Sequence, residues 1–188
     1  DGDGVTATVD EGPPLRAVIA GLLADVSLQS AKNLVASTYA RIVETLSLND
    51  TRPAEEQIDA ILKANPDLIV IAGGTDGGAS KSLQSIIEVI GLAAYLMPKD
   101  RKPVVIFVGN KEMDDEVKEL LSPLSSGLYT APNIRPAIDT EDLLAARKEL
   151  AQAVVAIRKQ QLGGVDEIDL WTGGHLLPSV FTEGRIVN

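Results

Sequence analysis

The chain has 188 residues, which is enough for one domain with a buried hydrophobic core. Its formal net charge is −10, and its basic residues are scattered along the sequence. Nucleic-acid-binding domains concentrate basic side chains on one face, so this distribution argues against nucleic acid as a partner. There is no cysteine and only one histidine, which excludes disulfides, thiolate or histidine-rich metal sites and a cysteine nucleophile.

The apolar segments are far too short to span a bilayer, so we expect no membrane partner and a cytoplasmic location. Only 3% of the residues are aromatic, so the core must be aliphatic, which favours parallel α/β layers. We divide the chain into a flexible acidic segment at residues 1–14, an α/β domain at 15–162 and a tail at 163–188. The tail packs on the domain or leads to a missing neighbour.

The first predicted strand is the apolar run at residues 15–23, and a helix at 28–38 follows it with Ser27 as the N-cap. Residues 41–48 alternate between apolar and polar side chains, and form either a second strand or the tail of that helix. A helix at 53–64 comes next, opened by a proline and closed by an Asn-Pro pair.

Residues 67–72 (DLIVIA) are an unbroken aliphatic run, which predicts a strand buried on both faces. A glycine-rich loop leads from it into a long apolar helix at 80–96. The next strand is predicted at 103–108 (PVVIFV), followed by a charged amphipathic helix at 114–121. A weak fifth strand is expected near 127–131.

The last predicted helix runs from residue 140 to 161. Glu141 and Asp142 near its start and Arg158 and Lys159 near its end suit the helix dipole. Strands that alternate with helices imply right-handed crossovers and a parallel sheet. We therefore predict a three-layer α/β fold: a parallel flavodoxin-like (Rossmann-like) sheet of about five strands, in the order 2-1-3-4-5, with helices on both faces.

Ligands of such open sheets bind beyond the carboxyl ends of the strands. Three loops are expected to reach that edge, and they supply the candidate ligand-binding residues Asp25, Ser27, Gly73, Gly74, Thr75, Asp76, Gly77, Gly78, Gly109, Asn110 and Lys111. The central expectation is that residues 73–78 and 109–111 converge at one rim of the sheet.

The loop at 73–78 (GGTDGG) is the best candidate for ligand contact. Its glycines allow a ligand to approach the backbone, and the following helix favours an anion at its N-terminus. Thr75 adds a hydroxyl, Asp76 can hold a ribose hydroxyl or a hydrated cation, and Lys111 adds positive charge. The segment matches neither the dinucleotide fingerprint nor the P-loop, and glycines at this place also serve simply to turn the chain. The expected ligand is a nucleotide or another phosphate-bearing molecule; no cofactor or metal is assigned.

The tail contributes two further residues. His175 is interpreted as an ordinary loop histidine, because only sequence proximity suggests a dyad with Ser179. Trp171 is expected to anchor the tail by burying its ring. The catalytic residues, if any, are unknown from the sequence.

Two segments carry a family resemblance, namely residues 65–78 (NPDLIVIAGGTDGG) and 103–111 (PVVIFVGNK). They resemble the MutL family associated with glutamate mutase, and the similarity extends over most of the chain. The resemblance implies kinship to the superfamily of actin, sugar-kinase and heat-shock-chaperone ATPases. It also implies a chaperone or reactivating role beside adenosylcobalamin-dependent mutases.

The family's phosphate-gripping motifs, an Asp-Gly-Ser-Thr loop and a GGATTD-like loop, are absent from this sequence. The chain thus resembles an internal segment of a longer protein, and the resemblance does not extend to ATPase activity. Asp25 is not followed by the His and Gly of a cobalamin-binding DxHxxG loop, so cobalt ligation is not supported.

Three functions remain open from the sequence. The first is a non-catalytic ligand-sensing or partner-docking domain of a MutL-like accessory protein, with a cobalamin-dependent mutase and the rest of its own longer chain as partners. The second is a nucleotide- or phosphate-metabolite-binding enzyme domain that uses the loop at 73–78. The third is a purely structural module.

Overall fold

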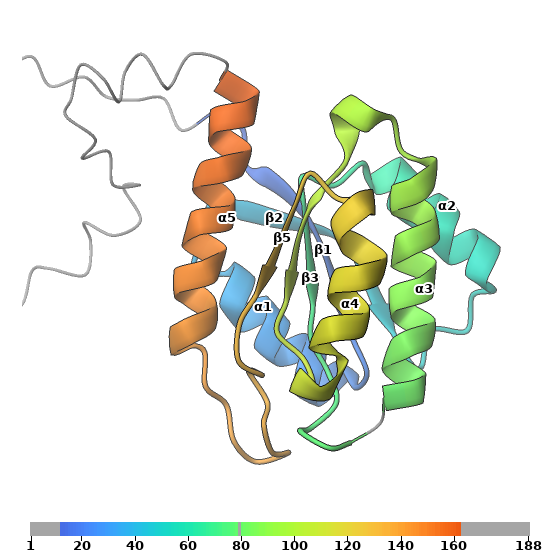
Figure 1. The fold of residues 1–188 in the computed structure, drawn as a ribbon, viewed down its shortest axis with the longest axis vertical. Coiled ribbons are helices and arrows are strands. Elements are labelled where there is room, and N and C mark those ends of the chain that lie inside the picture. The colour runs from blue at the N-terminus through green and yellow to red at the C-terminus, as the bar shows by residue number, and fades with distance from the viewer. Residues whose placement is uncertain (1–11, 79, 163–188) are drawn as a thin grey trace, which may run out of the picture.

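The computed structural model describes residues 12–78 and 80–162, which form an α/β sandwich of three layers (Figure 1). The segments that contain Trp171, His175 and Ser179 lie outside the described residues. The strands are β1 (Leu15–Gly21), β2 (Ala40–Ser47), β3 (Leu68–Ile71), β4 (Val104–Phe107) and β5 (Gly127–Thr130). The α-helices are α1 (Gln29–Val35), α2 (Ala54–Ala64), α3 (Ser80–Leu96), α4 (Asp114–Leu121) and α5 (Leu144–Leu162).

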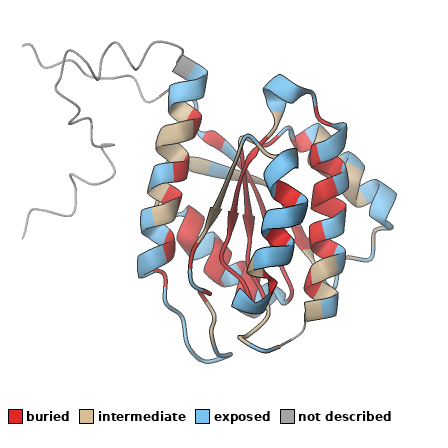
Figure 2. Cartoon of the chain, viewed as in Figure 1, coloured by how far each residue is buried: buried red, intermediate tan, exposed pale blue. Residues whose placement is uncertain are grey.

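All five strands are parallel and lie in the order β2-β1-β3-β4-β5, so the predicted sheet topology is confirmed. Of the segment predicted at 41–48, all residues but the last belong to strand β2, which decides between the two interpretations of that segment. The weak run near 127–131 forms the edge strand β5. Every side chain of β3 and β4 is buried, as expected for short aliphatic strands covered on both faces (Figure 2).

Two apolar layers cover the sheet. On one face, Ala17 and Ile19 of β1 pack in the cluster to which α1 and α5 contribute. On the other face, Val18 and Ala20 belong to the cluster built with α2, α3 and α4. The alternation along β1 follows from the two-residue period of a strand, which sends successive side chains to opposite faces.

The structure corrects two expected helix starts. Ser27 is not an N-cap, because it lies in a π-helical turn at Ala24–Leu28 and its hydroxyl bonds to the backbone of Leu23, while α1 begins at Gln29. The last helix begins at Leu144 rather than at residue 140. Glu141 is instead held by Ser30 of α1, a tertiary contact that local sequence patterns do not reveal.

Asn65 ends α2 in the left-handed conformation, with a φ of 43°. This residue type tolerates that conformation better than most, so the expected end of the helix is confirmed and has a local cause. None of the described helices is long and apolar enough to cross a membrane.

Candidate functional site

The loops at 73–78 and 109–111 lie against each other at the carboxyl edge of the sheet, at the lower rim in Figure 1. The backbone N–H of Asn110 donates to the carbonyl oxygen of Gly73 at 3.1 Å. The ammonium of Lys111 lies 3.7 Å from a carboxylate oxygen of Asp76. The structure therefore brings these two loops together, as the parallel topology predicts; ligand binding by them stays a prediction.

The glycines at this contact are required by close packing of the backbone. A Cβ atom on Gly109 would lie 2.8 Å from the carbonyl oxygen of Gly73. A Cβ on Gly73, whose φ is 133°, would lie 2.9 Å from the backbone nitrogen of Leu22. These distances are shorter than van der Waals contact. Close packing between neighbouring strand ends therefore requires glycine at both positions.

Most amides in the second half of the loop are already used within the protein. The N–H of Asp76 donates to Pro136 at 3.3 Å, that of Gly77 to the side chain of Asn110 at 3.4 Å, and that of Gly78 to Thr75 at 2.8 Å. Because an anion cradle needs free amides, these three groups cannot act together as a P-loop does. The amides of Gly74 and Thr75 and the Thr75 hydroxyl make no hydrogen bond within the described residues.

Two buried asparagines hold the loops in place, and one of them was not predicted. Asn110 is fully buried, and its side-chain oxygen accepts from the N–H groups of Gly77 and Glu112. Asn133, in the loop after β5, donates to the carbonyl oxygen of Gly74 at 2.8 Å and to Asp76 at 3.1 Å. Asn133 follows a strand of the same parallel sheet, so the rule that identified the other loops also identifies this one once β5 is accepted.

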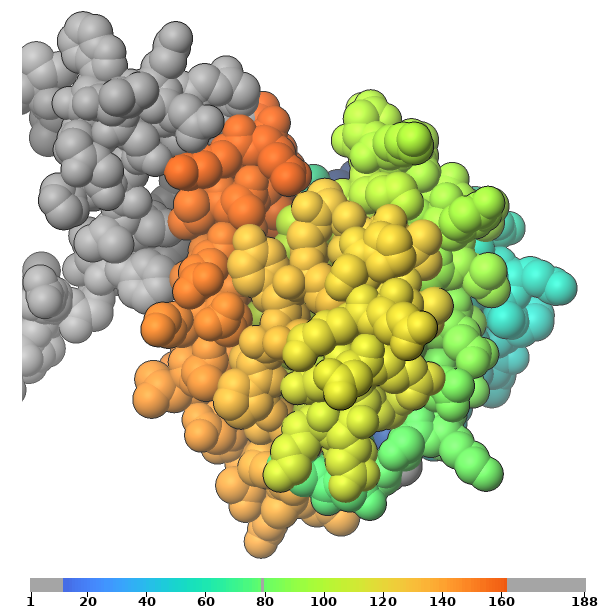
Figure 3. All heavy atoms as spheres, viewed as in Figure 1, coloured from blue at the N-terminus to red at the C-terminus, as the bar shows by residue number. Residues whose placement is uncertain are grey.

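The loop after β5 is itself fastened to α1 by a polar cluster of three side chains. The guanidinium of Arg135 donates to the hydroxyl of Ser30 at 2.6 Å, and this hydroxyl donates to Glu141 at 2.6 Å. Arg135 and Glu141 also form an ion pair at 3.8 Å. Figure 3 shows the segments after β3 and β5 and the start of α4 side by side at this rim.

Asp25 and Ser27 make no hydrogen bond or ion pair with the loops at 73–78 and 109–111. The hydroxyl of Ser27 is buried and accepts from the backbone N–H of Leu23 at 3.0 Å. Asp25 is exposed, and its carboxylate makes no hydrogen bond or ion pair with the described residues. Of the predicted residues, only those after β3 and β4 thus share a surface.

The rim carries opposing charges. Lys111 is 69% exposed and Asp76 is 29% exposed, so their pair is open to solvent. Burial raises the pKa of Asp114 at the start of α4; Lys118 lowers it, and the negative charges of Asp115 and Asp76 raise it further. In the described part of the chain, no group of three or more His, Cys, Asp or Glu side chains is arranged to hold a metal ion.

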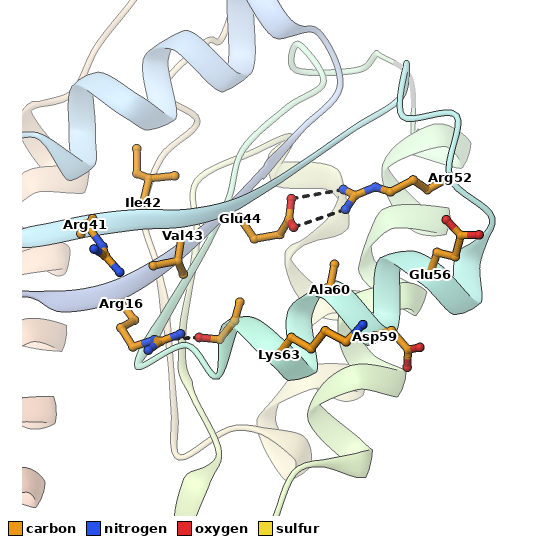
Figure 4. Close-up of a pocket in the computed structure, with 11 residues that line it drawn as sticks. Arg16, Arg41, Ile42, Val43, Glu44, Arg52, Glu56, Asp59, Ala60 and Lys63 are labelled. Atoms are coloured by element: carbon orange, nitrogen blue, oxygen red, sulfur yellow. Dashed lines mark hydrogen bonds and ion pairs between the residues drawn. The ribbon is translucent and has the colours of Figure 1, made fainter.

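The structure also contains a groove that sequence reasoning missed. It has a volume of about 850 Å³, lies between β2 and α2, and includes none of the predicted site residues (Figure 4). At its upper end Arg52 pairs with Glu44 at 3.2 Å and with Asp50 at 2.6 Å. No sequence motif marks this groove, because its lining residues come from three separate elements.

Two comparisons relate this chain to known proteins. A family model described as "MutL protein" matches residues 3–187. The chain is 26% identical over 165 residues to a protein of Clostridium tetanomorphum described as "Protein MutL". The match covers 88% of the chain but 34% of the relative, so the chain spans about a third of that protein's length.

We predict that Asn133→Ala loosens the rim. The substitution removes hydrogen bonds to Gly74 and Asp76, and one that Asn133 accepts from the N–H of Arg135 at 2.9 Å. Leaving buried partners unsatisfied costs roughly 1–3 kcal/mol of unfolding free energy, measurable by urea denaturation. Asn49→Ala, at an exposed turn, is the control. Equal stability of both variants would show that Asn133 does not hold the loops.

A second prediction concerns Arg52 and acid. The hydrogen bond from Arg52 lowers the pKa of Asp50, while burial of that carboxyl acts in the opposite direction. A lowered pKa in the folded state gives stability that is present above the ordinary Asp pKa of about 3.9 and is lost as the pH falls through the folded value. Arg52→Ala should therefore cost about 1 kcal/mol at neutral pH, and less as the solution is acidified.

Urea denaturation at several pH values measures this difference, with the exposed Lys32→Ala as the control. A gap between wild type and Arg52→Ala that grows on acidification would contradict the assignment.

Proposed function

The chain belongs to the MutL protein family, and from this we propose that it is a non-catalytic ligand-sensing or partner-docking domain of an accessory protein for adenosylcobalamin-dependent mutases. The observation that carries the proposal is the rim held by Asn110 and Asn133. Their side chains fix three loops that come from distant parts of the sequence. When loops are already held in place before binding, little further conformational entropy is lost on binding, which favours recognition.

The ligand we propose for this rim carries a phosphate or carboxylate group. Lys111 offers an exposed ammonium, Thr75 a hydroxyl, and α3 begins beside the loop with the positive end of its dipole. Asp76 competes for Lys111, but an exposed ion pair contributes only about 0–1 kcal/mol. An incoming anion can therefore displace the carboxylate from Lys111.

The docking part of the proposal rests on exposed apolar side chains near the same edge. Leu23 is 46% exposed, Ile138 is 68% exposed and Leu144 is 79% exposed. They belong to the segments after β1 and β5, whose ends flank the rim. We propose that these side chains together form the surface that a partner protein covers.

The alternative function is a nucleotide- or phosphate-metabolite-binding enzyme domain that uses the same loop. The observation in its favour is that the amides of Gly74 and Thr75, which make no hydrogen bond with the described part of the chain, lie in the same loop region as Lys111. It differs from the sensing role in one measurable way, since an enzyme converts the ligand. Product analysis by phosphorus NMR after incubation with ATP separates the two.

We predict that ADP, ATP or a small phosphorylated metabolite raises the melting temperature of the chain saturably. Ligand that binds the native state stabilises it by mass action, about 2.7 kcal/mol at a hundredfold excess over Kd. Lys111→Ala should abolish the shift, whereas Lys148→Ala, an exposed lysine on α5, should preserve it. The ligand-sensing role is rejected if all these compounds leave the melting curve unchanged at millimolar concentration.

We also predict binding to glutamate mutase, measured by surface plasmon resonance with the immobilised mutase. Ile138→Asp should weaken binding because it places a charge on the proposed docking surface. Tyr95→Asp is a matched control, since Tyr95 is also 68% exposed but lies near the far end of α3. Docking at the carboxyl edge would be refuted by an equal response of the two variants.

A further inference from the structure

The groove between β2 and α2 gathers basic side chains in an acidic protein. The chain has a formal net charge of −10, yet Arg16, Arg41, Arg52 and Lys63 all line this one groove. They come from β1, β2, the β2–α2 connection and α2, so no local sequence cluster explains their proximity. Figure 4 shows Arg16 and Arg41 directed towards the end of the groove where α2 terminates, whereas the side chain of Lys63 is directed back along α2 towards Asp59.

Arg16 and Arg41 are direct neighbours in the sheet. The parallel register of β1 and β2 pairs Arg16 with Arg41. Both lie on the sheet face covered by α2, because Leu15 and Ala17, on either side of Arg16, belong to the opposite cluster. Like charges on directly paired residues repel each other, and an anion bound between or above them would offset this repulsion.

The end of α2 accounts for only one of these charges. The Nε of Arg16 donates to the carbonyl oxygen of Ala64 at 2.8 Å, as a cation at a helix C-terminus should. Arg41 and Lys63 make no hydrogen bond or ion pair within the described residues. Asp67 accepts the backbone N–H of Arg16 at 2.8 Å, but forms no ion pair with its guanidinium in the described structure.

At the other end of the same groove, the cation is neutralised by ion pairs. There Arg52 is held by Glu44 and Asp50. Glu56 and Asp59 also line the groove on α2, yet neither forms an ion pair with Lys63. The groove therefore has a neutralised end and an end where two cations, Arg16 and Arg41, form no ion pair with any described residue.

We propose that this cationic end, formed by Arg16 and Arg41, is a second binding site that takes the oxyanion group of a small molecule, a phosphate or a carboxylate. Arg41 offers its whole planar fork of donors, and the two terminal nitrogens of Arg16 make no hydrogen bond with the described residues. The volume of about 850 Å³ is within the range of small-molecule sites.

This site is separate from the rim at the carboxyl edge and does not depend on the function proposed there. Arg16 and Arg41 stand near the starts of β1 and β2, so both lie at the opposite edge of the sheet. The net negative charge of the chain repels anions in general, so an anion retained here must be held by these particular side chains.

The test uses isothermal titration of the 188-residue chain with inorganic phosphate, pyrophosphate and citrate, together with mapping by amide chemical shifts. At least one of these probes should bind saturably and shift the amides of Arg16 and Arg41. Phosphate and pyrophosphate binding without citrate binding assigns a phosphate ligand, and the reverse assigns a carboxylate. Removal of one charged hydrogen-bonding group, as in Arg41→Gln, should weaken binding about tenfold or more.

Two variants serve as controls. Lys99→Gln removes an exposed lysine outside the groove and should leave the affinity unchanged. Lys111→Ala should abolish binding at the carboxyl edge but not in the groove, so the two sites can fail separately. The proposal is overturned if none of the probes binds at millimolar concentration, or if Arg41→Gln and Lys99→Gln reduce binding equally.

Discussion

The parallel pairing of β1, β3 and β4 is the constraint on which the rest of the structure depends. These strands are short and almost wholly buried, so their backbone groups must be satisfied by one another. In a parallel sheet all strands also end at the same edge, because each connection crosses back to the opposite edge before the next strand begins. For this reason, the loops after β3, β4 and β5, which come from distant parts of the sequence, meet at one rim.

Glycine and asparagine residues, rather than charged side chains, allow the loops to pack together at that rim. Glycine lets the strand ends approach below the distance that a Cβ would permit. Asparagine offers both a donor and an acceptor, so Asn133 can satisfy a carbonyl group of the neighbouring loop and an amide of its own loop at the same time. The consequence is a rim whose loops are joined by hydrogen bonds.

The two edges of the sheet differ in how their charges are compensated. At the carboxyl edge, Lys111 faces Asp76 and Arg135 faces Glu141. In the groove between β2 and α2, paired Arg16 and Arg41 form no ion pair with any residue that the structure describes, although acidic residues outnumber basic ones in the chain. An uncompensated pair in an acidic protein is a stronger indication of an external anion than the glycine-rich loop that stands out in the sequence.

The sequence alone determined the alternation of strands and helices, because aliphatic runs such as residues 68–71 can be buried only between two layers. It also indicated that residues 73–78 and 109–111 meet, since parallel strands share an edge. Only the tertiary structure showed that Ser27 is not a cap, that Asn133 holds the rim and that Arg16 lies beside Arg41. These contacts join residues far apart in the chain or depend on strand register. Local sequence propensity predicts neither long-range contacts nor register.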